Sequence, residues 1–142
     1  GQVRAAKLPI TEAEWQATVD GIFTFYGWRH YHTRVSKKSR EGFPDTVALR
    51  GKRIVVPELK INDELPDGDQ VLWLDAWEAS GAEVYVWYPD DVDYLHHVLG
   101  PVIPRAANVI GPGMAWRQEL IRKKHLAADT IDAIVRKVRV GG

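Results

Sequence analysis

The chain of 142 residues, 45% of them apolar and six of them tryptophan, is long enough for one domain with one hydrophobic core. It has no cysteine, which excludes disulfide-stabilised scaffolds, zinc fingers and cysteine nucleophiles and favours a cytoplasmic setting. No apolar run approaches the roughly 20 residues that span a bilayer, so no membrane partner is expected.

The net charge is zero, but the charges are sorted along the chain. Lysine and arginine outnumber acidic residues by ten to five in residues 1–53 and by eight to three in residues 101–142, whereas residues 54–99 hold one basic and eleven acidic side chains. Acidic clusters collect divalent cations and basic clusters collect phosphates. The sorting therefore suits a protein that holds a metal ion against a polyanion, although ordinary solvated charge gives the same pattern.

The first elements predicted are a helix and a strand. Thr11 precedes two acidic residues, and apolar residues then recur at helical spacing as far as Tyr26, which predicts a capped helix that ends near Gly27. Residues 28–33 alternate between large and polar side chains, as in a strand, and residues 34–42 have the composition of a basic loop.

A β-hairpin is predicted next. Residues 45–50 and 53–60 are strand-like runs separated by a turn at Gly51 and Lys52. Pro57 lies within the second run. Because proline removes a donor from the ladder, we expect a strand edge or a bulge at this position.

Beyond the hairpin the pattern predicts a helix, a strand and a second helix. Residues 61–68 form a polar loop, and Asp69 is placed to cap the helix that follows. Residues 83–88 are the most strand-like run of the chain, and Asp90 opens a short helix. The order of elements predicts an α/β fold with a four-stranded mixed sheet flanked by helices.

The remaining residues are predicted to extend this core. Residues 100–113 are rich in proline and glycine and form a linker, and residues 114–126 and 130–140 have the patterns of two helices. We therefore divide the chain into a core, residues 1–100, and a C-terminal helical extension, residues 101–142, which packs on the core or in a dimer interface.

Three side chains of the predicted hairpin have the chemistry of a phosphodiesterase. Period-two alternation places Glu58 and Lys60 on one sheet face and Leu59 on the other. The turn at Gly51 brings Asp45 to the same open end of the hairpin as Glu58, where two carboxylates can share Mg²⁺. Lys60 would orient a water or neutralise charge on the phosphorane. The pattern of one aspartate followed by Glu-x-Lys is short, however, and an ordinary hairpin with charged side chains facing solvent would also produce it.

The segments around these residues resemble the VRR-NUC branch of the PD-(D/E)XK nuclease superfamily over roughly residues 12–98. The similarity lies in the order of the elements and in the segments Tyr31-His-Thr33, Ser39-Arg-Glu-Gly-Phe-Pro-Asp45, Pro57-Glu-Leu-Lys60, Gln70-x-x-Trp73-Leu74 and Gly81-x-Glu-Val-Tyr-Val-Trp-Tyr-Pro89. It implies a restriction-endonuclease-like αβββαβ core in which Asp45 and Glu58 hold the metal and Lys60 is catalytic. The cofactor implied is Mg²⁺, for which Mn²⁺ substitutes.

The resemblance also implies further site residues. The family's first-helix glutamate, a metal ligand, corresponds best to Glu14, with Glu12 as the alternative. The backbone carbonyl of Leu59 would complete the coordination of the metal. Gln70 is in the family's catalytic glutamine position and would contact a ligand or the metal's water at the rim of the site. A plain helix-start residue is the other interpretation of Gln70.

DNA contacts are expected from one histidine and from the basic loop. His32 occupies the place of a family histidine near the cleavage site and would contact a phosphate or a water, or simply pack. Lys37, Lys38 and Arg40 would grip the DNA backbone, unless the loop is only solvated. The two-residue spacing of His30 and His32 permits a transition-metal site, which we do not expect, because no other soft ligand is near in sequence.

These inferences converge on a Mg²⁺-dependent endonuclease that hydrolyses DNA phosphodiester bonds. The resemblance implies a structure-specific enzyme for Holliday junctions or other branched DNA in repair and recombination, a homodimer whose two sites suit symmetric cuts, and an origin in a bacterial cell or a phage-infected host. Two alternatives stay open. One is a restriction or nicking endonuclease that reads short sequences, and the other is a catalytically silent DNA-binding module that kept the fold.

Overall fold

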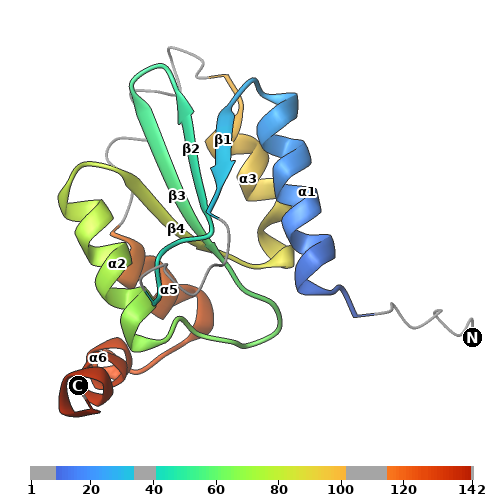
Figure 1. The fold of residues 1–142 in the computed structure, drawn as a ribbon. Helices are drawn as coiled ribbons and strands as arrows, with labels where there is room; N and C mark the ends of the chain where they lie inside the picture. The colour runs from blue at the N-terminus through green and yellow to red at the C-terminus, as the bar shows by residue number, and fades with distance from the viewer. Residues whose placement is uncertain (1–8, 34–40, 102–114, 142) are drawn as a thin grey trace, which may run out of the picture.

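The computed structural model describes residues 9–33, 41–101 and 115–141 (Figure 1). Its elements in chain order are α1 (Glu12–Phe25), β1 (Arg29–His32), β2 (Thr46–Arg50), β3 (Arg53–Leu59), α2 (Gly68–Ala79), β4 (Glu83–Trp87), the 3₁₀ turn η1 (Pro89–Asp91), α3 (Val92–Leu99), α5 (Trp116–Lys124) and α6 (Thr130–Gly141). Within these three ranges, no helix is long and apolar enough to cross a membrane.

The four strands form one sheet in the order β1-β2-β3-β4. β1 and β3 are both antiparallel to β2, and β4 is parallel to β3. The hairpin turn at Gly51 and Lys52 pairs Arg50 with Arg53. The predicted α/β class, with an αβββαβ order typical of restriction-endonuclease-like folds and a mixed four-stranded sheet flanked by helices, is therefore confirmed.

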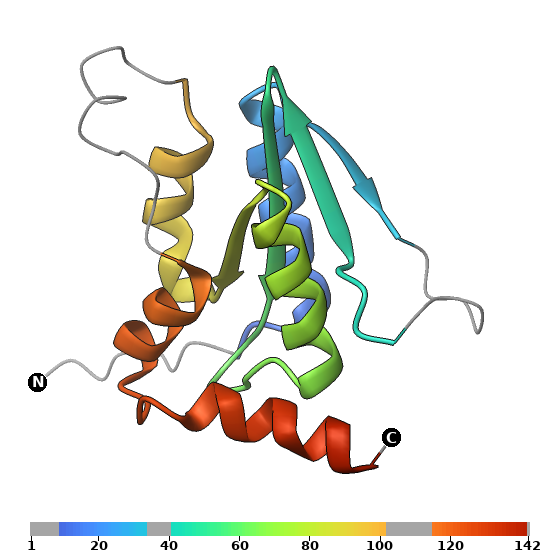
Figure 2. The same cartoon turned by 90° about the vertical axis from the view of Figure 1, so that its left-hand side faces the viewer.

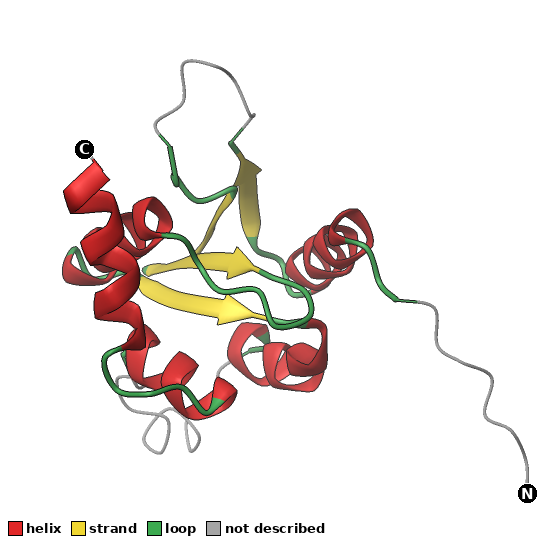
Figure 3. Cartoon of the chain, turned by 90° about the horizontal axis from the view of Figure 1, so that it is seen from below, coloured by secondary structure: helices red, strands yellow, loops and turns green. Residues whose placement is uncertain are grey.

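Helices cover both faces of the sheet, so the strands lie between two hydrophobic clusters (Figures 1 and 3). Alternation along β3 sends Val55 to the face covered by α1 and α3, and Val56 to the face covered by α2, α5 and α6. We call these the α1 face and the α2 face. Trp15 and Trp87 are fully buried in the α1-face cluster.

The two C-terminal helices are part of the core. Trp116 and Leu120 of α5 and Ile131 and Val135 of α6 all belong to the α2-face cluster. Figure 2 shows α6 crossing the start of α2, where a Cβ on Gly68 would meet the α6 backbone carbonyl of residue 134 at 3.0 Å. The predicted linker lies outside the described residues, apart from its first two positions.

The basic run of α5 makes contacts within the chain. Lys123 donates to the carbonyl oxygen of Val86 at 2.8 Å and to the carboxylate of Asp91 at 2.9 Å. The ammonium group of Lys124 lies 3.7 Å from the ring centroid of Tyr88. These lysines therefore fasten α5 to the sheet.

The strands β2 and β3 separate at the end opposite to their turn (Figure 2). Their pairing covers residues 48–50 against 53–55, whereas β2 stays paired with β1 as far as Thr46. Pro57 lies on β3 just beyond this pairing. The N–H of Lys60 donates to Trp87 of β4 at 3.0 Å, and because amide directions alternate along a strand, the nitrogen of Pro57 faces the β2 side. The strand edge expected at Pro57 is therefore the edge of β3 that faces β2, beyond the point where the pairing of β2 with β3 ends. We call the place where β2 and β3 separate the fork.

Candidate active site

Glu58 is a charged side chain in the interior. It lies at the end of β3 on the α2 face, with 5% of its surface exposed. The side-chain amide of Gln70 donates to its Oε1 at 2.8 Å, and the Nζ atom of Lys60 lies 3.9 Å from the same oxygen. Leu59 packs on the opposite face against the α1-face cluster. The alternation predicted for these three neighbours is the one observed.

The surroundings of Glu58 disfavour its charged form. Burial raises the pKa of Glu58 to about 7, and the nearby ammonium of Lys60 opposes this rise only in part. The negative charges of Asp45 and Asp67 raise the pKa further. Among the described residues, three carboxylates therefore share a site in which the nearest cation is one ammonium group, and a divalent cation would remove this imbalance.

Asp45 stands opposite Glu58 across the fork. The register of the hairpin pairs Ala48 with Val55; continued by three residues along each strand, it places Asp45 across from Glu58. Both side chains project from the α2 face. The carboxylate of Asp45 is exposed, and its backbone carbonyl accepts a hydrogen bond from the N–H of Thr33 at 2.9 Å.

The segment that leads into Asp45 is docked on α2. Trp73 donates from its indole nitrogen to the carbonyl oxygen of Glu41 at 3.1 Å. The ring of Phe43 meets the ring of Trp73 edge to face, with centroids 4.8 Å apart. Trp73 is partly buried and holds this segment against α2.

Gly42 allows the closest approach in this docking. Its φ is +78°, and a Cβ built on it would lie 2.5 Å from the backbone nitrogen of Gln70 and 2.7 Å from the Cβ of Asp69. Only glycine fits such a position. The Gly-Phe-Pro-Asp segment therefore fixes the distance between Asp45 and the start of α2.

The start of α2 holds Gln70 in one orientation. Asp67 is the N-cap: its carboxylate accepts from the N–H of Gln70 at 2.9 Å, and its own N–H donates to the side-chain oxygen of Gln70 at 2.9 Å. The prediction of Asp69 as the cap was wrong. Because the amide oxygen is engaged with Asp67, the amide nitrogen is left to face Glu58. The signal that would have found Asp67 is the spacing Asp67-x-x-Gln70.

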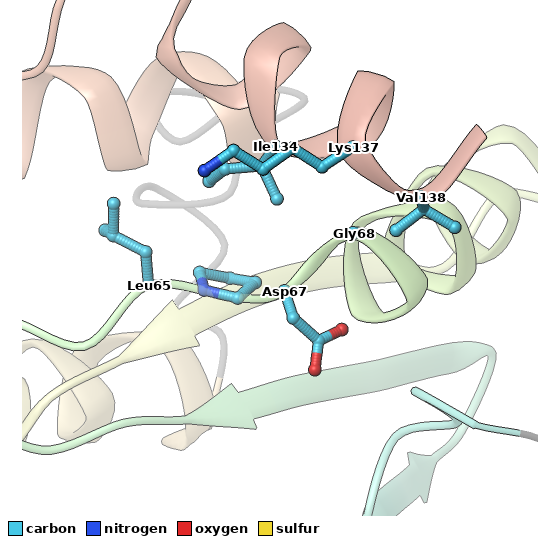
Figure 4. A pocket seen from close by; sticks show the side chains of 7 residues that line it. Leu65, Asp67, Gly68, Ile134, Lys137 and Val138 are labelled. Carbon is cyan, nitrogen blue, oxygen red and sulfur yellow. The ribbon is translucent and has the colours of Figure 1, made fainter. Parts of the chain in front are cut away.

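A shallow groove of about 450 Å³ lies between this cap and α6 (Figure 4). Leu65, Pro66, Gly68, Ile134 and Val138 give it an apolar lining, with Asp67 and Lys137 at its rim. In Figure 4 the carboxylate of Asp67 points away from Ile134 and Val138. The apolar lining of the groove is thus turned away from the Asp67 carboxylate.

The start of α1 is anchored beside Lys60. The indole nitrogen of Trp15 donates to the carbonyl of Trp87 at 3.1 Å, and this carbonyl also accepts from the N–H of Lys60. The carboxylate of Glu14 accepts from the N–H of Thr11 at 3.2 Å in a capping box. Its role as a metal ligand, and that of the Leu59 carbonyl, stay predictions.

Of the predicted DNA contacts, His32 alone falls within the described residues. His32 projects from the α1 face, and its two ring nitrogens are within hydrogen-bonding distance of Asp20 and Thr46. A phosphate contact through either nitrogen requires one of these bonds to break. Lys37, Lys38 and Arg40 lie outside the described residues.

Comparison with known proteins finds a distant structural similarity. No family model and no curated protein matches the chain. Among solved structures, the chain is similar to Hjc, a Holliday junction resolvase from the archaeal hyperthermophile Archaeoglobus fulgidus, with 24% sequence identity over 54% of this chain and 69% of that chain and a TM-score of 0.44.

Proposed function

We propose that the protein is a Mg²⁺-dependent endonuclease that hydrolyses DNA phosphodiester bonds, with Asp45, Glu58 and Lys60 as its catalytic residues. The observation that carries the proposal is the grouping of these residues at the fork. Glu58 contacts Lys60 directly, and Asp45 lies close enough for its charge to raise the pKa of Glu58. The sequence resemblance to the VRR-NUC nucleases implies the same three residues.

The donor set fits a hard divalent cation. Carboxylate oxygens are the ligands that Mg²⁺ prefers, and the fork places Asp45 and Glu58 opposite each other with Asp67 nearby. The chemistry that such an ion supplies is the polarisation of a phosphoryl oxygen and the activation of a bound water. Glu14 and the Leu59 carbonyl are proposed as additional ligands.

Lys60 and Gln70 have separate roles in this proposal. Lys60 is 15% exposed at its side chain, and its ammonium would stabilise negative charge that develops on the phosphorane. Gln70 touches Glu58 and is therefore a positioning residue, which holds one carboxylate oxygen and leaves the other for the cation. His32 and the loop residues Lys37, Lys38 and Arg40 are proposed to contact phosphates.

The activity is tested with labelled linear, flap, splayed and four-way DNA in the presence of Mg²⁺ or Mn²⁺. We expect cleavage that EDTA abolishes and that Lys60→Ala reduces by at least about 100-fold. Lys52→Ala is the matched control, because Lys52 is exposed at the far end of the hairpin. Equal cleavage by wild type and Lys60→Ala would refute the assignment of the site.

The same experiment identifies the substrate class. We propose branched DNA, and cleavage of the four-way substrate alone, at symmetric positions, supports a resolvase that acts as a homodimer. Cleavage of linear DNA at short sequences indicates a restriction or nicking enzyme. Binding without cleavage under every metal condition indicates a catalytically silent module and overturns the proposal.

A further inference from the structure

A second group of ligand-type side chains lies on the α1 face, on the other side of the sheet from Glu58. Asp20 of α1 lies between two histidines of β1. Its Oδ2 is 2.9 Å from Nε2 of His32, and its Oδ1 is 3.8 Å from Nε2 of His30. One ligand atom from each of the three residues lies within 4.8 Å of the other two.

We propose that Asp20, His30 and His32 form a binding site for a divalent transition-metal ion such as Zn²⁺. A zinc ion binds imidazole nitrogen and carboxylate oxygen at about 2.0–2.2 Å, so two donors on one ion lie roughly 3–4 Å apart. Both Asp–His separations fall in or at the edge of this range. The ligand nitrogens of His30 and His32 lie within 4.8 Å of each other. Small rotations of these two side chains, which are not fully buried, bring the two nitrogens to the separation of roughly 3–4 Å that one ion requires. Three ligands leave a coordination position for water.

The ligand atoms are already oriented by neighbouring groups. Nδ1 of His32 is 3.0 Å from the hydroxyl of Thr46, which leaves Nε2 to face Asp20. Gln16 donates to Oδ1 of Asp20 at 3.0 Å and to the Thr46 hydroxyl at 3.3 Å. Such hydrogen bonds hold the tautomer and the direction of metal ligands.

The ring of His30 is held as well. It stacks on the ring of Phe23, a fully buried residue of α1, with centroids 5.5 Å apart. Because His30 and His32 alternate with the exposed Tyr31, both project toward α1. A metal at this position would therefore connect α1 to β1, which is an edge strand of the sheet.

The ligand chemistry separates this site from the carboxylate site. Two imidazoles and one carboxylate favour zinc, nickel or cobalt over magnesium, whereas the fork offers oxygen ligands. Thr46 directly follows Asp45 in the chain, but its side chain lies on the α1 face with the histidines. The inference does not depend on the proposed nuclease activity. It excludes the phosphate contact proposed for His32, because Nδ1 of His32 faces Thr46 and its Nε2 would bind the metal.

Calorimetric titration of the full chain with ZnCl₂ tests the site. We expect one zinc ion per chain, with affinity lowered at least about 10-fold in Asp20→Asn, His30→Ala and His32→Ala. His97→Ala is the matched control, since His97 is exposed on α3. Asp45→Asn, which alters the carboxylate site, should leave zinc binding unchanged. The imidazole NMR signals of His30 and His32 should shift on titration.

Two results would overturn the proposal. One is zinc binding that persists with wild-type affinity in Asp20→Asn or His30→Ala, and the other is zinc binding that disappears in Asp45→Asn. Asp20→Asn keeps the size of the side chain and decides the question if a histidine variant fails to fold, as judged by circular dichroism.

Discussion

Gln70 donates a hydrogen bond from its side-chain nitrogen to the buried carboxylate of Glu58, over 2.8 Å. The oxygen of the same amide accepts from the backbone of Asp67, so the N-cap of α2 determines which atom of Gln70 faces the site. A helix-capping interaction and a site contact thus share one side chain. The consequences of this arrangement can be measured.

Replacing Gln70 with glutamate should separate the two interactions. A glutamate at the same position keeps the acceptor for the Asp67 N–H, so α2 should retain its start. It loses the donor to Glu58 and adds a like charge beside it. We expect DNA cleavage at pH 7 to fall by about 10- to 100-fold, with a thermal melting curve close to that of the wild type. A large drop in melting temperature would show that Gln70 is mainly structural.

The raised pKa of Glu58 makes the stability of the protein depend on pH. Burial raises this pKa from 4.5 to about 7, so between these values the folded chain keeps a proton that the unfolded chain has lost. Stability is therefore lost as pH rises through this window and the loss is complete above about pH 7. We expect Glu58→Gln to be more stabilising at pH 8 than at pH 5 in urea unfolding. An equal effect at both values would contradict the shift.

Gly42 and Gly51 form a matched pair, because both have a positive φ but only Gly42 is crowded. We expect Gly42→Ala to lower the free energy of unfolding by about 2–4 kcal/mol and to abolish most cleavage, since the added Cβ pushes the Asp45 segment away from α2. Gly51→Ala should cost only the strain of about 1–2 kcal/mol and keep the activity. Chemical denaturation and a cleavage assay measure both. Similar effects of the two substitutions would refute the role of the docking.

The C-terminal helices should behave as part of the core in unfolding experiments. Ile131 of α6 is 2% exposed within the α2-face cluster, so we expect Ile131→Ala to cost about 2–5 kcal/mol. Arg136→Ala, at an exposed position of the same helix, should change stability by less than about 0.5 kcal/mol. Unfolding in two separate transitions would instead indicate that α6 is an independent appendage.

The hairpin contacts could be predicted from the sequence because they depend on local rules. A two-residue turn at Gly51 fixes the register, and the register places Asp45 across from Glu58. Alternation then assigns Lys60 to the same face as Glu58. The contact between Gln70 and Glu58 joins a helix to a strand across a loop, and the position of Gln70 alone did not specify its partner.

Other features were missed for identifiable reasons. Asp67 and Asp69 both suit a helix start, and the choice depends on the residue three positions later, which is Gln70 for Asp67. The meeting of Asp20 with His30 and His32 depends on how α1 packs on β1. No spacing along the chain encodes this packing angle, so a site shared by two elements is visible only once they are folded together.

Pro57 has a consequence for assembly. A fork inside a sheet leaves strand edges without a ladder partner, and an extended segment of another chain can add to such an edge, which is how β-proteins aggregate or exchange strands. On the β3 side of the fork, the missing N–H of Pro57 interrupts the row of donors that an incoming strand would need. The residue that disrupts the ladder thereby disfavours the addition of a strand from another chain.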